Sequence, residues 1–339
     1  MTKKIGLVIQ GPLTSIGRTG ANLHASPEQL KKDGGIVHFD CRGNIQRVIE
    51  EFGHFFDEIV VSTWDNEVKA GESFLGAKLV SAPDPGGIAQ PGHYKDNNKY
   101  RQFISVLNGL NELEKSGVEY VVKIRTDQYM NINGLLSSFF TSLETNQDRR
   151  AIYATVVCRP TFLLHDLYFA STLSSMKEFC QDILAYDCFE FISSVHREMV
   201  LKHAYLHYRE FINVPDWAYF PISPPNGVNP ATRKIFDYMF SKVFFSIDPD
   251  VFRSTLWRGE YYEVEHISAL VEINRKSRKY NIPALISTDW RRYFYFRKKF
   301  FGHSMSVIDW CVMQIGSVGW NFWSIIRRVA TRPIIKKFL

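Results

Sequence analysis

The sequence predicts an α/β fold with a mostly parallel central sheet and helices on both of its faces. The first observation is that the opening 130 residues alternate short apolar runs of strand length with longer stretches of helical spacing. This alternation is typical of right-handed βαβ units. The second is composition: of 339 residues, 45% are hydrophobic and 22% charged, and the mean hydropathy is −0.17. These values exclude a disordered chain, a collagen-like repeat and a polytopic membrane protein.

Buried strands are expected where apolar residues run together without alternation. The first such run, Ile5–Ile9, stops at the turn-forming residues that follow it. Three more strands are expected at Asp57–Thr63, Lys78–Ser81 and Tyr120–Ile124.

Two stretches between these strands place apolar residues on one helical face, Asp40–Phe52 and Asn97–Leu113. The segments Leu13–Gly35 and Pro83–Gly92 are rich in turn-forming residues and are expected to be irregular. Beyond residue 150 the pattern is mixed. It predicts strands at Ala151–Val157 and Tyr168–Ala170 and helices at Thr172–Ala185, Ser194–Tyr208 and Tyr261–Tyr280.

The net charge of +6 is unevenly distributed. From Asp289 to the C-terminus ten Lys or Arg residues accompany two Asp residues, so this segment carries +8 and the rest of the chain −2. Its basic clusters are mixed with Trp310, Trp320 and Trp323, a composition that suits a helix in an anionic membrane interface. A packed helical subdomain is the alternative. A nucleic-acid-binding protein more often spreads positive charge over its folded face, so no nucleic acid partner is expected.

The five cysteines form an odd set without a CxxC pair. They indicate neither a disulfide framework nor a zinc site, and a reducing compartment is expected. The N-terminal apolar run is too short for a signal peptide, and no stretch of eighteen apolar residues predicts a membrane-spanning helix.

Polar residues follow three of the expected strands, and ligands of open parallel sheets bind beyond these carboxyl ends. The segments are Gln10-Gly11-Pro12, Ser62-Thr63-Trp64-Asp65 and Arg125-Thr126-Asp127-Gln128. Neither GxGxxG nor GxxxxGK[ST] is present, so nucleotide binding by another route is expected. Trp64 is a candidate for stacking on a nucleobase and Asp65 for accepting from a ribose hydroxyl, although Asp65 could equally be an exposed turn residue.

Positive groups lie near the same edge. Asn98, Arg101 and Gln102 open the second predicted helix, where backbone N–H groups attract phosphate; a hydrophilic helix start is the alternative. Lys123 and Arg125 could neutralise a leaving diphosphate.

Asp127 is the sharpest candidate, because a carboxylate at a strand end can hold a divalent cation that bridges two phosphates. Capping of the following turn is the alternative role. Asp166 and Glu198 are candidate bases for deprotonating an acceptor hydroxyl, and a structural role is open for each. The pair His203 and His207 has metal-binding spacing but lacks an HExxH pattern, so a surface or core role is favoured.

Several of these segments occur in the order found in the WavE family of lipopolysaccharide-synthesis proteins, which the chain resembles over roughly residues 4–280. The segments are Leu7–Pro12, Glu58–Asp65, Asn97–Gln102, Val122–Gln128 and His165–Phe169. The resemblance implies a GT-A-like glycosyltransferase that uses a nucleotide-sugar donor and builds a bacterial surface glycan such as lipopolysaccharide, O-antigen or capsule. In that fold a DxD-like motif holds Mg²⁺ or Mn²⁺ on the diphosphate.

In this chain the corresponding motif is Arg125-Thr126-Asp127, which has one carboxylate. Arg and Lys side chains could therefore do part of the cation's work, or the donor could be a CMP-sugar. We expect a GT-A-like domain over residues 1–285 and a basic, aromatic-rich helical extension over residues 286–339. The extension would hold a cytoplasmic enzyme on the inner face of the inner membrane, near a glycan or lipid-linked glycan acceptor. A sugar nucleotidyltransferase and a non-catalytic scaffold of a polysaccharide assembly complex are the alternatives.

Overall fold

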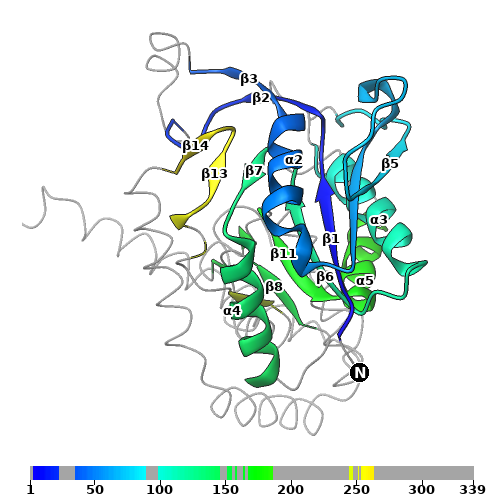
Figure 1. Ribbon diagram of the computed structural model, residues 1–339, viewed down its shortest axis with the longest axis vertical. Helices are drawn as coiled ribbons and strands as arrows, with labels where there is room; N and C mark the ends of the chain where they lie inside the picture. The colour runs from blue at the N-terminus through cyan, green and yellow to red at the C-terminus, as the bar shows by residue number, and fades with distance from the viewer. Residues whose placement is uncertain are drawn as a thin grey trace, which may run out of the picture. The chain divides into compact units, whose positions relative to one another are not determined.

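The computed structural model places strands and helices in alternation around one sheet (Figure 1). It describes residues 3–22, 35–88, 98–145, 151–154, 157–158, 163–164, 167–185, 244–246, 251 and 253–262. All of them belong to a single compact unit of the chain. The predicted division at residue 285 lies outside the described residues and stays a prediction.

The central sheet has seven strands in the order β12-β8-β11-β6-β1-β4-β5. Parallel pairing joins β6, β1, β4 and β5 and also joins β12 to β8, whereas β11 is antiparallel to both of its neighbours. The mostly parallel sheet predicted from the sequence is therefore confirmed. The strands are β1 (Ile5–Gln10), β4 (Glu58–Trp64), β5 (Lys78–Ala82), β6 (Tyr120–Arg125), β8 (Ile152–Ala154), β11 (Phe169–Thr172) and β12 (Phe244–Ser246).

Helices cover both faces of this sheet. On one face α2 (Cys41–Phe52) and α4 (Ile132–Thr145) pack their apolar side chains against alternate residues of β1, β4 and β6, such as Leu7, Val61 and Val122. On the other face α3 (Lys99–Glu114) packs on β1 and β4, and α5 (Leu173–Leu184) packs on β11 and α3. Both faces are thus buried, which explains why the strands are continuous apolar runs.

The helices that the sequence predicts are confirmed within one or two residues for α2, α3 and α5. Asp40 begins α2 as its N-cap, since its side chain accepts from the Arg42 amide, and Thr172 caps α5 in the same way. The pattern of the sequence predicts no element at the residues of α4. The predicted helix at 194–208 lies outside the described residues, and the one at 261–280 is wrong at its start, because Tyr261 is in a strand.

Two of the smaller sheets lie beyond the carboxyl ends of the central strands. The segment after β1, expected to be irregular, contains β2 (Thr14–Gly17), which pairs with β3 (Val37–Asp40). A three-stranded sheet joins β7 (Gln128–Tyr129) to a hairpin of β13 (Leu256–Trp257) and β14 (Glu260–Tyr261). The remaining elements are the pair β9 (Val157–Cys158) and β10 (Leu163–Leu164) and the 3₁₀ helices Gly53–Phe55 and Asp65–Glu67.

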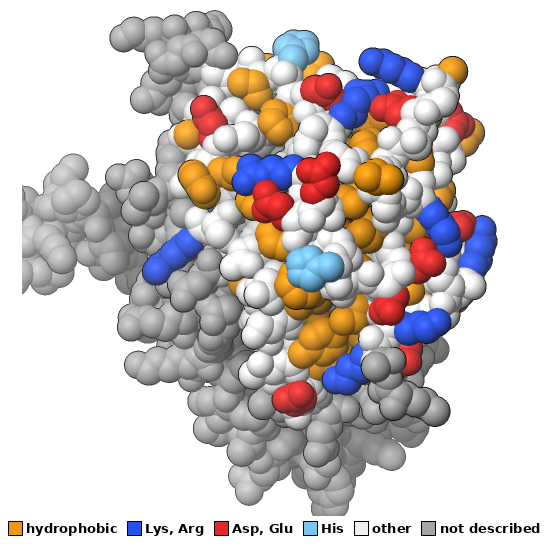
Figure 2. Space-filling view, viewed as in Figure 1, with side chains coloured by type: hydrophobic (Ala, Val, Ile, Leu, Met, Phe, Trp, Pro, Cys, Tyr) orange, Lys and Arg blue, Asp and Glu red, His pale blue; other side chains and the backbone are white. Residues whose placement is uncertain are grey.

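Within the described ranges, no helix combines the length and the apolar character needed to cross a bilayer. On the face seen in Figure 2, Lys and Arg side chains are interspersed with Asp and Glu rather than gathered by sign.

Candidate functional site

The carboxyl ends of β1, β4 and β6 meet at one edge of the sheet, as the sequence predicts. Gln10 pairs in register with Ser62 of β4 and with Arg125 of β6. Beyond the strands, the Gly11 amide donates to the Ser62 carbonyl at 3.1 Å, and the Thr126 amide donates to the Gln10 carbonyl at 3.0 Å. The three polar segments singled out in the sequence are therefore neighbours.

Gly11 is required at this edge by close packing. It has φ +137°, and a Cβ on it would lie 2.7 Å from the Thr126 hydroxyl oxygen. That hydroxyl donates to the Pro12 carbonyl at 2.7 Å. Gly11 and Pro12 thus fix the path of the chain across the end of β6.

Gln10 and Trp64 lie on the face of the sheet that α3 covers. The Ser62 hydroxyl donates to the carbonyl of Ser105 in α3 at 2.7 Å, so this side of β4 faces the helix. Alternate residues of a strand share a face, which places Trp64 on the same side, and Gln10 joins them as the register partner of Ser62. Gln10 and Trp64 are both buried.

Arg101, in the first turn of α3, is fixed beside Trp64. Its guanidinium carbon lies 5.4 Å from the centre of the Trp64 ring. One terminal nitrogen is 2.5 Å from an Asp84 carboxylate oxygen, and the other donates to the Asn98 side-chain oxygen at 3.4 Å. The structure therefore brings Arg101, Asn98 and Trp64 together, and Asp84 joins them as a residue that the sequence analysis missed.

Several buried polar atoms at this edge have no hydrogen-bond partner among the described residues. On the α3 side these are Gln10 Oε1, Arg101 Nε and Gln102 Nε2, and Thr63 Oγ1 and both Gln128 amide atoms are in the same condition. Leaving such a group unsatisfied costs about 1–3 kcal/mol each. Native proteins rarely keep such groups together without a ligand or ordered water to satisfy them, so the α3 side of the edge has the character of a polar binding site.

Thr63 and Asp65 lie apart from this group. Thr63 is on the other face of β4, the face on which Val61 packs into the core with Ile45 of α2. Asp65 is exposed at the first position of a 3₁₀ helix just past the strand.

Lys123 is fully buried within β6, with its ammonium nitrogen 5.1 Å from the centre of the Phe169 ring. It lies two residues before the strand end.

The carboxylate of Asp127 is surrounded by donors. Arg125 forms a two-point ion pair with it, with Nε 2.9 Å from Oδ1 and Nη2 3.0 Å from Oδ2. Oδ2 also lies 3.2 Å from Nη2 of Arg258 and accepts from the Ser15 hydroxyl at 2.9 Å and from the Trp257 indole at 3.1 Å. Asp127 is 2% exposed, so these contacts take the place of nearly all of its contact with solvent.

The hairpin of β13 and β14 brings two of these donors to the edge. Its turn consists of Arg258 and Gly259, with φ +50° and +84°, as in a type I′ turn. The Arg258 amide donates to the Asp127 carbonyl at 2.9 Å, and the Gly20 amide donates to the Trp257 carbonyl at 3.0 Å. The hairpin is thereby attached both to the end of β6 and to the loop after β2.

The pKa of Asp127 reports the balance of these contacts. Burial raises it, but the charge of Arg125, the hydrogen bond from Arg125, the charge of Arg258 and the Ser15 hydroxyl together outweigh burial and lower the pKa to about 2. Burial lowers the pKa of the Arg258 guanidinium, and the charge of Asp127 opposes this. The carboxylate is therefore ionised at neutral pH, and the cluster of two guanidinium groups and one carboxylate carries a net charge of +1.

These residues do not fit the divalent-cation site that the sequence suggested. A cation at Asp127 would lie beside two guanidinium groups, and Oδ2 is already occupied by donors from Arg125, Arg258, Ser15 and Trp257. The part of the chain that the structure describes contains no group of three His, Cys, Asp or Glu side chains arranged to hold a metal ion.

Two predicted site residues, Asp166 and Glu198, lie outside the described residues, as do His203 and His207. The sequence analysis in turn missed Ser15, Trp257 and Arg258. A signal for the last two was present, because a two-residue turn that ends in glycine, between Leu256-Trp257 and Glu260-Tyr261, is typical of a hairpin. Nothing in the sequence indicates where that hairpin docks.

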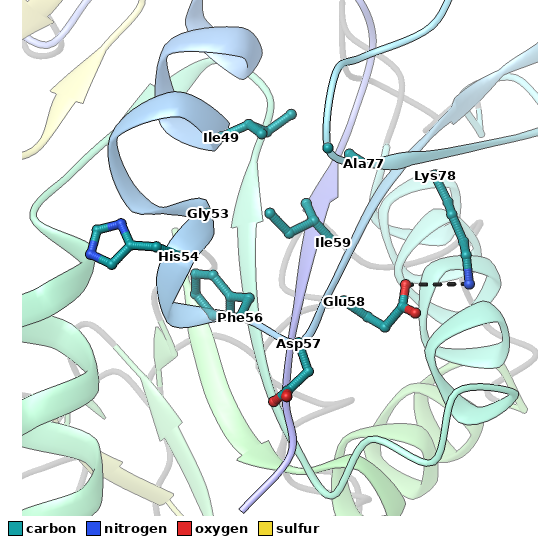
Figure 3. A pocket seen from close by; sticks show the side chains of 10 residues that line it. Ile49, Gly53, His54, Phe56, Asp57, Glu58, Ile59, Ala77 and Lys78 are labelled. Atoms are coloured by element: carbon teal, nitrogen blue, oxygen red, sulfur yellow. Dashed lines mark ion pairs between the residues drawn. The ribbon is translucent and has the colours of Figure 1, made fainter.

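A separate pocket of about 360 Å³ opens at the opposite edge of the sheet (Figure 3). It lies between the end of α2 and the starts of β4 and β5, and the Glu58–Lys78 ion pair, at 3.2 Å, is part of its wall. None of the buried unpartnered atoms found in the described residues belongs to this pocket. The polar site is therefore at the carboxyl edge and not at this pocket.

Comparison with known proteins gives one family. The model of the WavE lipopolysaccharide synthesis family matches residues 35–187, a stretch that includes α2, β4, α3, β6 and Asp127. This confirms the resemblance over that stretch, which leaves out β1 and its Gln10-Gly11-Pro12 end. No curated protein matches the chain.

Two solved structures are similar to parts of the chain. One is the mannose-1-phosphate geranyltransferase of Thermus thermophilus, with 14% identity and a TM-score of 0.32 over 56% of this chain and 66% of that one. The other is 4-diphosphocytidyl-2C-methyl-D-erythritolsynthase of Anaerococcus prevotii, with 10% identity and a TM-score of 0.31 over 80% of this chain and 97% of that one. The chain thus spans just under two thirds of the first structure.

Proposed function

We propose that this protein is a glycosyltransferase of lipopolysaccharide or related surface-glycan synthesis that binds a nucleotide-sugar donor at the carboxyl edge of β1, β4 and β6. The observation that carries the proposal is the set of buried polar atoms of Gln10, Arg101 and Gln102 at that edge that have no hydrogen-bond partner in the described part of the chain. A nucleotide offers donors and acceptors that would satisfy them. The match of residues 35–187 to the WavE family supports a role in lipopolysaccharide synthesis.

In the proposed reaction, a hydroxyl oxygen of the acceptor glycan attacks the anomeric carbon of the donor sugar. The bond between that carbon and the phosphate oxygen breaks, and the nucleotide leaves with the electron pair. Arg101 and Arg125 would stabilise the charge that develops on the leaving phosphate. Asp166 or Glu198 would accept the hydroxyl proton if the reaction inverts the anomeric centre by direct displacement.

Membrane attachment is the second part of the proposal. Residues 286–339 would bind the anionic inner face of the bacterial inner membrane and bring the cytoplasmic enzyme near a lipid-linked acceptor. Sedimentation with vesicles tests this: we expect the protein to pellet with vesicles that contain phosphatidylglycerol and to stay in solution with phosphatidylcholine alone. Equal behaviour with the two kinds of vesicle would contradict it.

The donor is tested by thermal unfolding of the whole protein with UDP, GDP, CMP, TDP and ADP and with their sugar derivatives. A ligand that binds only the folded protein raises the melting temperature by mass action. We expect one nucleotide series to do so and its sugar derivative to be consumed when an acceptor is present. Release of pyrophosphate from a nucleoside triphosphate and a sugar phosphate would instead indicate a nucleotidyltransferase, and no shift with any ligand would indicate a scaffold.

Variants connect binding to the named atoms. Gln10→Leu and Gln102→Leu each remove a side-chain amide with one buried atom, Gln10 Oε1 or Gln102 Nε2, that has no hydrogen-bond partner among the described residues. Replacement by an apolar group of similar size should therefore leave the free protein as stable as before, or more stable. Nucleotide affinity should fall about three- to tenfold, the equivalent of one neutral hydrogen bond.

Gln46→Leu is the matched control. Gln46 lies on α2, which covers the face of the sheet opposite to α3, and its amide donates to Glu50 at 3.1 Å. Its replacement should leave nucleotide affinity unchanged. Undiminished affinity in both Gln10→Leu and Gln102→Leu would remove these atoms from the site.

A further inference from the structure

We propose that Arg125, held together with Arg258 by Asp127, binds the phosphate groups of the donor directly, so that donor binding needs no divalent cation. Asp127 is then a positioning residue and not a metal ligand. This inference rests on the proposed function for the identity of the donor. The anion site itself can be tested without a nucleotide.

The guanidinium groups of Arg125 and Arg258 are held in fixed positions. The two guanidinium groups share one carboxylate and also flank the same indole ring, since their carbons lie 4.5 Å (Arg258) and 6.0 Å (Arg125) from the centre of the Trp257 ring. Arg258 in addition donates from Nε to the Ser15 hydroxyl at 2.9 Å and from Nη1 to the Arg18 carbonyl. Such groups are positioned before a ligand arrives, which reduces the entropy lost on binding.

Two guanidinium groups and one ionised carboxylate leave one positive charge at the edge, close to the end of β1. The side chain of Arg125 is 25% exposed, compared with 8% for Arg258 and 2% for Asp127. Arg125 is therefore the group that a phosphate can reach, whereas the buried Arg258 contributes through its charge. Guanidinium groups match phosphate oxygens geometrically and stay charged at all physiological pH values.

The role of Asp127 can be read from whether its neutralisation strengthens or weakens anion binding. A carboxylate that was merely near the site would repel an anion, so its neutralisation would tighten binding. A carboxylate that holds Arg125 and Arg258 in place has the opposite effect, because its loss releases both guanidinium groups. A metal ligand differs from both, because its loss matters only when the metal is present.

The experiment is calorimetric titration of the whole protein with inorganic pyrophosphate, and with any nucleotide that raises the melting temperature, in EDTA and again in Mg²⁺. We expect both ligands to bind in EDTA, with an affinity equal to or higher than that in Mg²⁺. Arg125→Gln should weaken binding about ten- to a hundredfold, the equivalent of a charged hydrogen bond. Asp127→Asn should weaken it in the same direction in both buffers.

Two controls keep the result interpretable. Arg47→Gln removes an arginine that also pairs with a carboxylate, at 2.9 Å from Glu51, but lies on the surface of α2, and it should change nothing. Should Asp127→Asn fail to fold, Arg125→Gln alone decides, because that side chain is partly exposed and its loss leaves Asp127 paired with Arg258.

The outcomes separate the two proposals. Binding that requires Mg²⁺, or tighter binding by Asp127→Asn, overturns this inference and leaves the glycosyltransferase proposal intact. Pyrophosphate binding in EDTA that depends on Arg125, with no binding of any nucleotide or nucleotide sugar, leaves the anion site intact and overturns the proposed donor. No pyrophosphate binding in either buffer overturns the anion site.

Discussion

The ion pairs of Asp127 should make the folded protein lose stability at low pH, and the substitution Asp127→Asn should remove this part of the pH dependence. The pKa of the carboxyl is about 2 in the folded protein, compared with an ordinary value of 3.8. Because one pKa unit corresponds to about 1.4 kcal/mol, this difference contributes about 2 kcal/mol to the free energy of unfolding. Since the pKa is lowered on folding, the contribution is complete above about pH 4 and is lost as the pH falls through about 2.

Urea unfolding of the wild type and of Asp127→Asn, followed by circular dichroism from about pH 6 to about pH 2, measures this contribution. Other acidic groups titrate in both proteins, so the difference between the two free energies isolates Asp127. We expect the wild type to lose about 2 kcal/mol more than the variant over that range. Glu51→Gln removes an exposed carboxylate that pairs with Arg47; exposed pairs contribute at most about 1 kcal/mol, so its pH profile should stay close to that of the wild type. Parallel pH profiles for the wild type and Asp127→Asn would refute the ion-pair argument.

Two further predictions concern glycines. In Gly109→Ala the new Cβ lies 2.6 Å from a Val8 methyl carbon, so α3 must move away from β1; we expect a loss of about 1–3 kcal/mol in urea unfolding despite the better helix propensity of alanine. In Gly20→Ala the Cβ lies 2.8 Å from the backbone carbonyl carbon of Tyr261, so the hairpin that carries Arg258 must shift. We expect pyrophosphate affinity in EDTA to fall in Gly20→Ala and to be retained in Gly109→Ala, which titration calorimetry on the two variants compares directly.

The sequence was sufficient to predict the parallel core and the edge at which polar residues gather. Continuous apolar runs mark strands that are buried on both faces, and parallel strands bring their carboxyl ends to one edge. These two rules place Gln10, Trp64 and Arg125 at the edge. Arg101 is placed near them as well, because a helix that follows a parallel strand begins close to that strand's end.

The surroundings of Asp127 could not be predicted, because they come from distant parts of the chain. Ser15 is 112 residues away in the sequence and Trp257 is 130 away, and no periodicity relates them. A short hairpin carries a local turn signal but no signal for where it docks. Spacing alone therefore indicated a carboxylate ready for a metal ion, whereas the tertiary contacts surround it with donors.

The charge of this cluster connects its stability to its proposed ligand. Burial of Arg258 is costly for an ion and is offset by Asp127, which must also serve Arg125. One carboxylate cannot neutralise two guanidinium groups, so these three side chains together retain one excess positive charge. A bound phosphate would supply the missing negative charge where Arg125 is accessible, and the same contacts that stabilise the ligand would attach the β13–β14 hairpin more firmly to the end of β6. Binding of the anion and attachment of the β13–β14 hairpin are therefore coupled. For this reason Asp127, although its charge repels phosphate, can still be needed for phosphate to bind.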